Sequence, residues 1–296
     1  MNLCTNAVAA AAATLCSACD GAAMPRETVD MLFALDVRAA ASHPQPALVE
    51  AGRRAFAAPQ PGGSCASCHP LDELGSDGQL HGRATPPLAD VARQTQFGWD
   101  GAIADLPTMI RHEAERHQGR VLEAEEAASI AAFLTAWRTR GRWDRFVEGD
   151  DDALSPAEQS GLHAFVTTGC AACHGGRNLG GRSRHKLGAA EPHPVADQGL
   201  FERTGLAADR WLFRAPMLRH AAATAPYLHD HSLTDLEATV VFMARHELGK
   251  AIDAATASSI ARFLRAVGDR DPDAVDIAAS QNSATPNGGG HAIAIR

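Results

Sequence analysis

The sequence has few aromatic and β-branched residues and lacks long hydrophobic runs. Aromatic residues make up 5% of the 296 residues, and a single one of them is a tyrosine. Strands favour β-branched and aromatic residues, whereas the plentiful alanine, leucine and arginine favour helices. A mainly α-helical fold is therefore predicted. The one apolar run near the start, residues 8–16, is too short to anchor the chain in a bilayer, so no membrane span is expected.

Basic residues are fewer than acidic residues. The formal net charge is −8, and the lysines and arginines are scattered along the chain, so there is no sign of a nucleic-acid partner. The seven cysteines are an odd number, which argues against a simple framework of disulfides.

Two Cys-x-x-Cys-His pentapeptides are the strongest signals that are present. They consist of Cys65, Cys68 and His69, and of Cys170, Cys173 and His174. Two thiols three positions apart can add to the two vinyl groups of one porphyrin, and the histidine that follows can then ligate the iron. The sequence therefore predicts two covalently bound haem c groups, with both histidines as axial ligands.

Zinc and dithiol redox chemistry are the alternatives for such motifs. A zinc ribbon has its cysteine pairs about 15–20 residues apart, and His69 and His174 are separated by far more than that. A thioredoxin-like dithiol requires a βαβ context, which the sequence does not indicate. The two motifs therefore favour haem attachment over zinc binding or dithiol redox chemistry.

The order of helix, haem motif, loops and closing helix occurs twice, which predicts two tandem cytochrome c-like haem domains. Helices are expected at 47–57 and 122–137 in the first, and from Ser155, from Thr234 and over 253–267 in the second. The predicted domains are 46–142 and 143–270, with a charged, glycine-rich linker near 141–152. Residues 1–45 are expected to be a leader and lead-in, and 271–296 a disordered tail.

Several segments resemble the bacterial dihaem cytochrome c peroxidases. Residues 213–220 read Phe-Arg-Ala-Pro-Met-Leu-Arg-His, and 224–230 read Thr-Ala-Pro-Tyr-Leu-His-Asp, which looks like the C-terminal signature of that family. Residues 143–146 resemble the segment that joins its two haem domains. The stretch 97–101, Phe-Gly-Trp-Asp-Gly, is similar to its Phe-Trp-Asp-Gly motif. The resemblance covers about 47–268.

The resemblance implies roles for three further residues. Met243 falls where the family has the thioether ligand of the high-potential, electron-accepting haem, although a methionine on an apolar helix stripe is usually a core residue. His81 matches the distal ligand of the peroxidatic N-terminal haem, which must leave before peroxide binds; otherwise it is a solvated loop histidine. Trp99 is implied to lie between the two haems, or else to be a buried aromatic residue.

The sequence departs from the family at the acid–base residues. The family carries a glutamine and a catalytic glutamate downstream of the tryptophan, and here these positions are Met109 and Gly119. Cleaving the O–O bond of peroxide heterolytically requires such a group. Glu113 is the first choice as a replacement, ahead of Glu115 and His112, each of which can equally be a solvated residue on a helix surface.

The sequence also departs from the family at the residues that bind its calcium ion. Its side-chain ligand is an asparagine, and here that position is Ala84. Backbone carbonyls of Thr224 and Pro226 remain, but a site without a side-chain oxygen should bind calcium weakly. His220 and His231 stand where the family has asparagine and glycine, which changes the surroundings of the signature loop.

The resemblance implies a peroxidase that reduces hydrogen peroxide to water with electrons from a small cytochrome c or cupredoxin, and family members are often homodimers. Two alternatives stay open. One is a dihaem enzyme that uses peroxide to oxidise a partner protein; its methylamine-related branch has a tyrosine where this chain has Met243. The other is a dihaem electron carrier without enzymatic activity.

We expect the protein to be exported to the periplasm, because covalent haem attachment is normally completed outside the cytoplasm. Small residues follow the apolar run at 8–16, as at a signal-peptide cleavage site. No lysine or arginine precedes that run, so the signal peptide is atypical.

Overall fold

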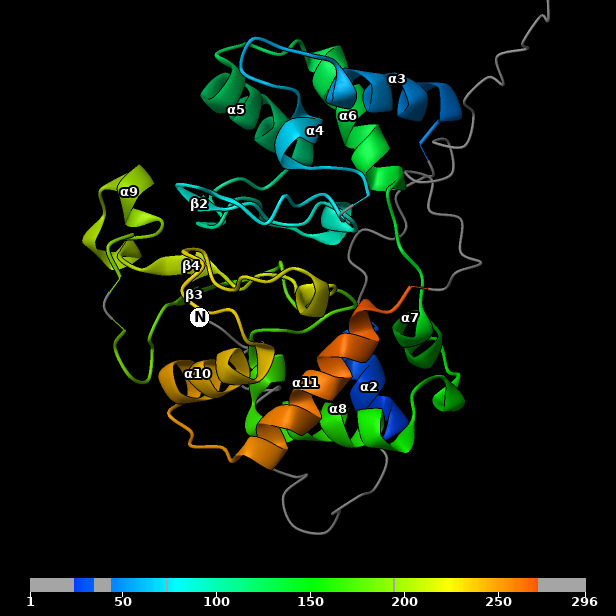
Figure 1. Ribbon diagram of the computed structural model, residues 1–296, viewed down its shortest axis with the longest axis vertical. Helices are drawn as coiled ribbons and strands as arrows, with labels where there is room; N and C mark the ends of the chain where they lie inside the picture. The colour runs from blue at the N-terminus through cyan, green and yellow to red at the C-terminus, as the bar shows by residue number, and fades with distance from the viewer. Residues whose placement is uncertain (1–23, 35–43, 73, 194, 271–296) are drawn as a thin grey trace, which may run out of the picture.

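The computed structural model describes residues 24–34, 44–72, 74–193 and 195–270. Most of the expected leader and the expected tail at 271–296 lie outside these residues. Helices dominate the described part, which confirms the prediction of a mainly α-helical fold. Figure 1 shows two groups of helices, one above the other, with short strands and loops between them.

The upper group is formed by residues of the first predicted domain. Its elements are α3 (Pro46–Ala57), α4 (Cys65–Cys68), β1 (Leu80–His81), β2 (Arg83–Ala84), η1 (Val91–Arg93), α5 (Leu106–Gln118) and α6 (Ala124–Ala136). Strands β1 and β2 form an antiparallel hairpin. Phe56, Phe133 and Trp137 are almost completely buried in its core. We call this group the first half.

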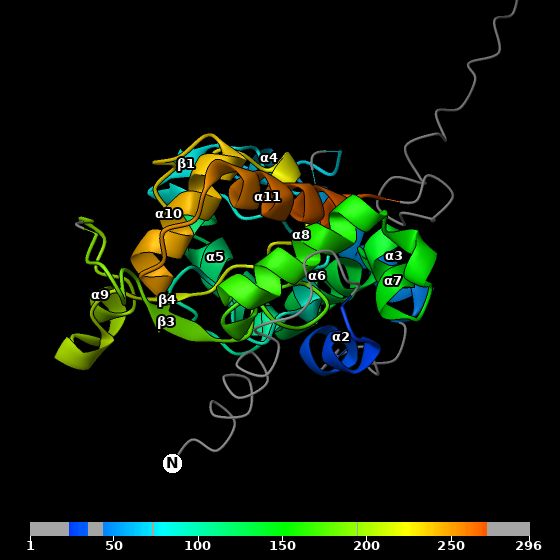
Figure 2. The same cartoon turned by 90° about the horizontal axis from the view of Figure 1, so that it is seen from below.

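The lower group, the second half, has its own core. Its elements are α7 (Arg142–Val147), η2 (Asp151–Ala153), α8 (Pro156–Thr168), η3 (Cys170–Ala172), β3 (Arg184–Lys186), α9 (Phe201–Thr204), η4 (Ala207–Asp209), β4 (Leu212–Arg214), η5 (Ala221–Ala223), α10 (Leu236–Leu248) and α11 (Ala254–Gly268). Strands β3 and β4 pair antiparallel. In both Figure 1 and Figure 2, α9 lies on the opposite side of the molecule from α7.

A further helix, α2 (Arg26–Phe33), packs against the second half. The Phe33 ring meets the buried Trp143 ring edge-on at 5.3 Å between centroids. This helix corrects the expectation of a leader and lead-in over residues 1–45, because α2 lies within that stretch. Trp143 belongs to α7, so part of the expected linker is also helical and buried.

Both halves are built on a close crossing of two helices at a glycine. A Cβ atom at Gly52 of α3 would lie 1.8 Å from the carbonyl oxygen of Ser129 on α6. A Cβ atom at Gly161 of α8 would lie 2.2 Å from the carbonyl oxygen of Ser259 on α11. Any side chain would force these helices apart, so the same residue type sets the same packing twice.

The repeat extends to α5 and α10. Each helix has an aspartate as N-cap, and Asp105 and Asp235 accept hydrogen bonds of 2.8 Å from the backbone N–H groups of Thr108 and Ala238. Each ends at a glycine with positive φ, Gly119 or Gly249. The expected capping box at Thr234 is wrong by one residue, because the Asp235 carboxylate caps the helix instead.

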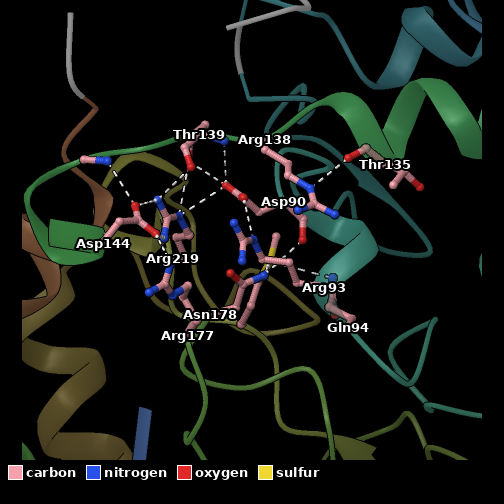
Figure 3. Close-up of polar contacts among 12 residues, drawn as sticks. Asp90, Arg93, Gln94, Thr135, Arg138, Thr139, Asp144, Arg177, Asn178 and Arg219 are labelled. Atoms are coloured by element: carbon pink, nitrogen blue, oxygen red, sulfur yellow. Dashed lines mark hydrogen bonds and ion pairs between the residues drawn. The ribbon is translucent and has the colours of Figure 1, made fainter. Parts of the chain in front are cut away.

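Buried polar contacts join the two halves (Figure 3). Arg219 is fully buried, and its guanidinium lies 3.2 Å from the carboxylate of Asp90 and 2.5 Å from that of Asp144. Asn178 donates a hydrogen bond of 3.0 Å to the Asp90 carbonyl oxygen. Because Asp90 belongs to the first half and the other residues to the second, this network fixes one half against the other.

Candidate active site

The first haem motif lines a cavity in the first half. α4 places Cys65 and Cys68 one turn apart, and His69 follows directly as its C-cap residue. All three side chains line the cavity, and α5 forms another of its walls. The second motif repeats the arrangement, since η3 and the two residues after it bring Cys170, Cys173 and His174 to a cavity in the second half.

Both motif histidines are oriented by backbone carbonyls. The Nδ1 atom of His69 lies 2.6 Å from the Gly75 carbonyl oxygen, and that of His174 lies 3.2 Å from the Leu179 oxygen and 3.1 Å from the Pro216 oxygen. Burial lowers the pKa of His69, and it lowers the pKa of His174 to about 4. Each imidazole is therefore neutral, with Nδ1–H donating and the Nε2 lone pair available to a metal.

The four motif cysteines form no disulfide bonds. Burial raises the pKa of Cys65, Cys68 and Cys173, and it raises the pKa of Cys170 to about 12. Neutral sulfur atoms at the wall of an apolar cavity fit thioether attachment of a porphyrin, whereas a structural zinc site would need stabilised thiolates. The residues present thus fit a haem in each cavity.

Met243 and Glu113 hold the same position in the two halves. When α5 is aligned with α10 by their aspartate caps and terminal glycines, Glu113 on α5 coincides with Met243 on α10. Met243 lines the second cavity, together with His174, and Glu113 lines the first, together with His69. The fold therefore presents a thioether to one cavity and a carboxylate to the other.

Glu113 is held by two histidines of its own helix. Its carboxylate oxygens lie 3.1 Å from Nδ1 of His112 and 3.0 Å from Nε2 of His117. Of the three acid–base candidates, Glu113 lines the cavity, whereas Glu115 is exposed and neither Glu115 nor His112 is among the lining residues. Gly119, where the family has its glutamate, is the αL residue that ends the helix.

His81 lies at the rim of the first cavity. Its side chain is 44% exposed, and its Nε2 atom is 2.9 Å from the carboxylate of Asp77. Asp77 is in turn tied to the haem motif, because its backbone N–H donates to the Cys68 carbonyl oxygen at 3.0 Å. His81 therefore reaches the cavity from the β1–β2 hairpin but is bonded to a carboxylate.

Trp99 lines both cavities. Its indole Nε1–H donates a hydrogen bond of 2.7 Å to the carbonyl oxygen of Ala84. The backbone around it is paired between the halves: the Ala84 N–H donates to the His229 carbonyl, and the Arg214 N–H donates to the Trp99 carbonyl, both at 2.8 Å.

Gln94 and Arg214, which the sequence analysis did not select, are among the residues that line both cavities. Arg214 belongs to the family-like stretch at 213–220, so the signal was present. However, Arg214 also lines the cavity of the first half, and this contact between the halves cannot be predicted from the linear sequence.

The chain is similar in sequence to several known peroxidases. The cytochrome c551 peroxidase of Pseudomonas aeruginosa is 28% identical over 255 residues, which cover 71% of this chain and 74% of that protein. The cytochrome c551 peroxidase of Nitrosomonas europaea is 27% identical, with coverages of 75% and 79%. The methylamine utilization protein MauG of Methylorubrum extorquens is 28% identical over 60% of this chain and 62% of its own. No protein-family model matches the sequence.

Among solved structures, the chain resembles a MauG-like protein associated with microbial copper homeostasis. The TM-score is 0.63 at 24% identity, and the match covers 77% of this chain and 90% of that one. This likeness supports the predicted fold of two cytochrome c-like haem domains. In the described part of the chain, every helix is too short or too polar to cross a membrane. In sequence, the chain is similar to bacterial cytochrome c peroxidases.

Proposed function

We propose that the protein is a periplasmic dihaem c-type peroxidase, which reduces hydrogen peroxide to water with electrons from a small redox protein. The observation that carries this proposal is the pair of cavities with a haem motif each, a tryptophan between them, and different residues at the equivalent positions 113 and 243. When bound, the haems would supply the redox chemistry of peroxide reduction and of electron storage.

In this account the second half receives electrons. His174 and Met243 would be the axial ligands of its haem, attached through Cys170 and Cys173. A thioether ligand favours ferrous iron and raises the reduction potential, as an electron-entry site requires. Trp99, in the wall of both cavities, would couple the two haems electronically.

The first half would carry out the reaction with peroxide. Cys65, Cys68 and His69 would hold its haem, and the Glu113 carboxylate would accept a proton from peroxide and return it to the departing oxygen. His81 is the proposed removable ligand. Its hydrogen bond to Asp77 would hold it away from the peroxide site once it has been released.

The alternatives depend on the same cavities. Oxidation of a partner protein is favoured by the similarity to MauG, whereas the methionine at 243 argues against the methylamine-related branch. An electron carrier would need no carboxylate at the first haem, and Glu113 therefore disfavours that alternative.

The test is a His69→Gly variant beside a Met243→Leu variant, both purified with their haems. Loss of peroxide reduction in His69→Gly, with an intact second haem spectrum, supports the proposed division of roles. Peroxide turnover that survives in His69→Gly would place the reaction elsewhere and contradict it.

A further inference from the structure

Among the residues that the structure describes, the buried cation Arg214 has no ion-pair partner. The residue is 4% exposed and lines both cavities. Its Nε–H donates a hydrogen bond of 2.8 Å to the Gly98 carbonyl oxygen, and Nη1 donates to the side-chain oxygen of Gln94. Both acceptors are neutral, and Nη2 donates no hydrogen bond to any of the described residues. Burial lowers the pKa of Arg214 to about 10, so the group is charged at neutral pH.

Arg219, which is also buried, differs from Arg214 in having ion-pair partners. Arg219 is paired with the carboxylates of Asp90 and Asp144. A buried charge is costly unless an opposite charge and hydrogen bonds compensate it. Arg214 has no carboxylate within ion-pair distance in the described part of the chain, so its unused donors indicate that an anionic group completes the site.

The position of Arg214 limits what that anion can be. Its backbone N–H is bonded to the Trp99 carbonyl oxygen at 2.8 Å, which fixes the residue at the boundary between the cavities. Its counterpart in the first half, Ala84, has no charge. A haem brings two propionate carboxylates, and arginine binds carboxylates in a planar, two-pronged geometry.

We propose that the Arg214 guanidinium binds a propionate carboxylate of a haem at the boundary of the two cavities and raises that haem's reduction potential. The inference rests on the proposed dihaem function. The physical reason is that a ferrous haem carries one positive charge fewer than a ferric haem, so a nearby fixed cation favours the reduced form. This charge would lie next to Trp99, on the path between the two haems.

The experiment is a potentiometric titration of the holoprotein, without peroxide, for the wild type, Arg214→Gln and Arg214→Lys. We expect a lower midpoint potential for at least one haem in Arg214→Gln and a smaller decrease in Arg214→Lys. The haem that shifts identifies the propionate involved. Arg245→Gln is the control, because Arg245 on α10 is 64% exposed and paired with Glu191, so water screens its charge.

Unchanged potentials of both haems in Arg214→Gln would overturn the proposal. If that variant does not retain its haems, resonance Raman spectra of wild type and Arg214→Lys decide the matter through the propionate bending bands. A shifted band supports a bond from Arg214 to a propionate, and identical bands contradict it. Neither readout needs peroxide turnover, so failure of the peroxidase assay leaves this test intact.

Discussion

The Asp90 carboxylate lies 3.2 Å from Nε2 of His220, and the two residues hold the same position in the two halves, 130 residues apart. Both have positive φ, and both directly precede a short 3-10 helix. Equivalent positions of the two halves are therefore in direct contact at the boundary between them. Arg219 adds the countercharge next to this contact. Although burial alone would raise it, the pKa of Asp90 is held well below its usual range by Arg219 and His220.

Replacing Asp90 with asparagine should destabilise the protein strongly. The change leaves Arg219 buried with less compensation, and breaking a buried pair costs about 3–5 kcal/mol. Denaturant unfolding of Asp90→Asn beside wild type measures the loss. Glu50→Gln, which removes the more exposed ion pairs with Arg53 and Arg54 on α3, is the control and should change stability much less.

Acid should weaken the contact between α7 and α8. Arg142 donates to both carboxylate oxygens of Glu158, at 2.7 and 2.8 Å, and chiefly these bonds lower the pKa of Glu158 to about 2. A depressed pKa stabilises the fold above the unfolded value of about 4.3, and this contribution disappears as pH falls from there towards 2. Melting curves between pH 6 and 3 should therefore show less loss for Glu158→Gln than for wild type. Parallel curves for the two proteins would contradict the linkage.

Glu113→Gln should reduce peroxide turnover by about 10²- to 10⁴-fold, since the amide cannot accept the proton of peroxide. The matched control is Glu115→Gln, because Glu115 is on the same helix but exposed and away from the cavity. Stopped-flow reaction of each half-reduced variant with peroxide is the measurement. Equal rates of reaction with peroxide for the two variants would show that Glu113 is not the acid–base residue.

Trp99→Phe should slow electron transfer between the haems while leaving both haems attached. The substitution removes the hydrogen bond to the Ala84 carbonyl oxygen. It also replaces the indole in the wall of both cavities with a smaller ring. Flash reduction of the second haem, followed by the appearance of electrons on the first, measures the step. Trp211→Phe is the control, because Trp211 lines neither cavity, and its rate should equal that of wild type.

Much of this site could be predicted from local sequence. The two Cys-x-x-Cys-His motifs predict where both haem cavities lie, because the attachment of a porphyrin to two cysteines depends on their spacing within one helical turn. Met243 and Trp99 followed from the resemblance, and the capping residue Ser155 was visible from the residues that follow it.

The order of elements showed a repeat, but the residue-by-residue equivalence of the two halves was not visible in the sequence. The segments around Trp99 and His229 share one aspartate in five positions, so the backbone pairing that makes them equivalent leaves little trace in residue identity. Glu113 and Met243 differ entirely in chemistry, and their common position emerges from the caps of α5 and α10. The helix at 26–33 was missed because its burial depends on Trp143, more than a hundred residues later.

The central claim is that the first haem reduces peroxide with electrons that enter at the second. The most direct measurement is peroxide-dependent oxidation of a reduced small cytochrome c by the purified dihaem protein, before and after half-reduction. The account predicts rapid oxidation of the donor that requires peroxide and proceeds from the half-reduced state. No turnover, with both haems still six-coordinate after half-reduction, would contradict it and indicate an electron carrier.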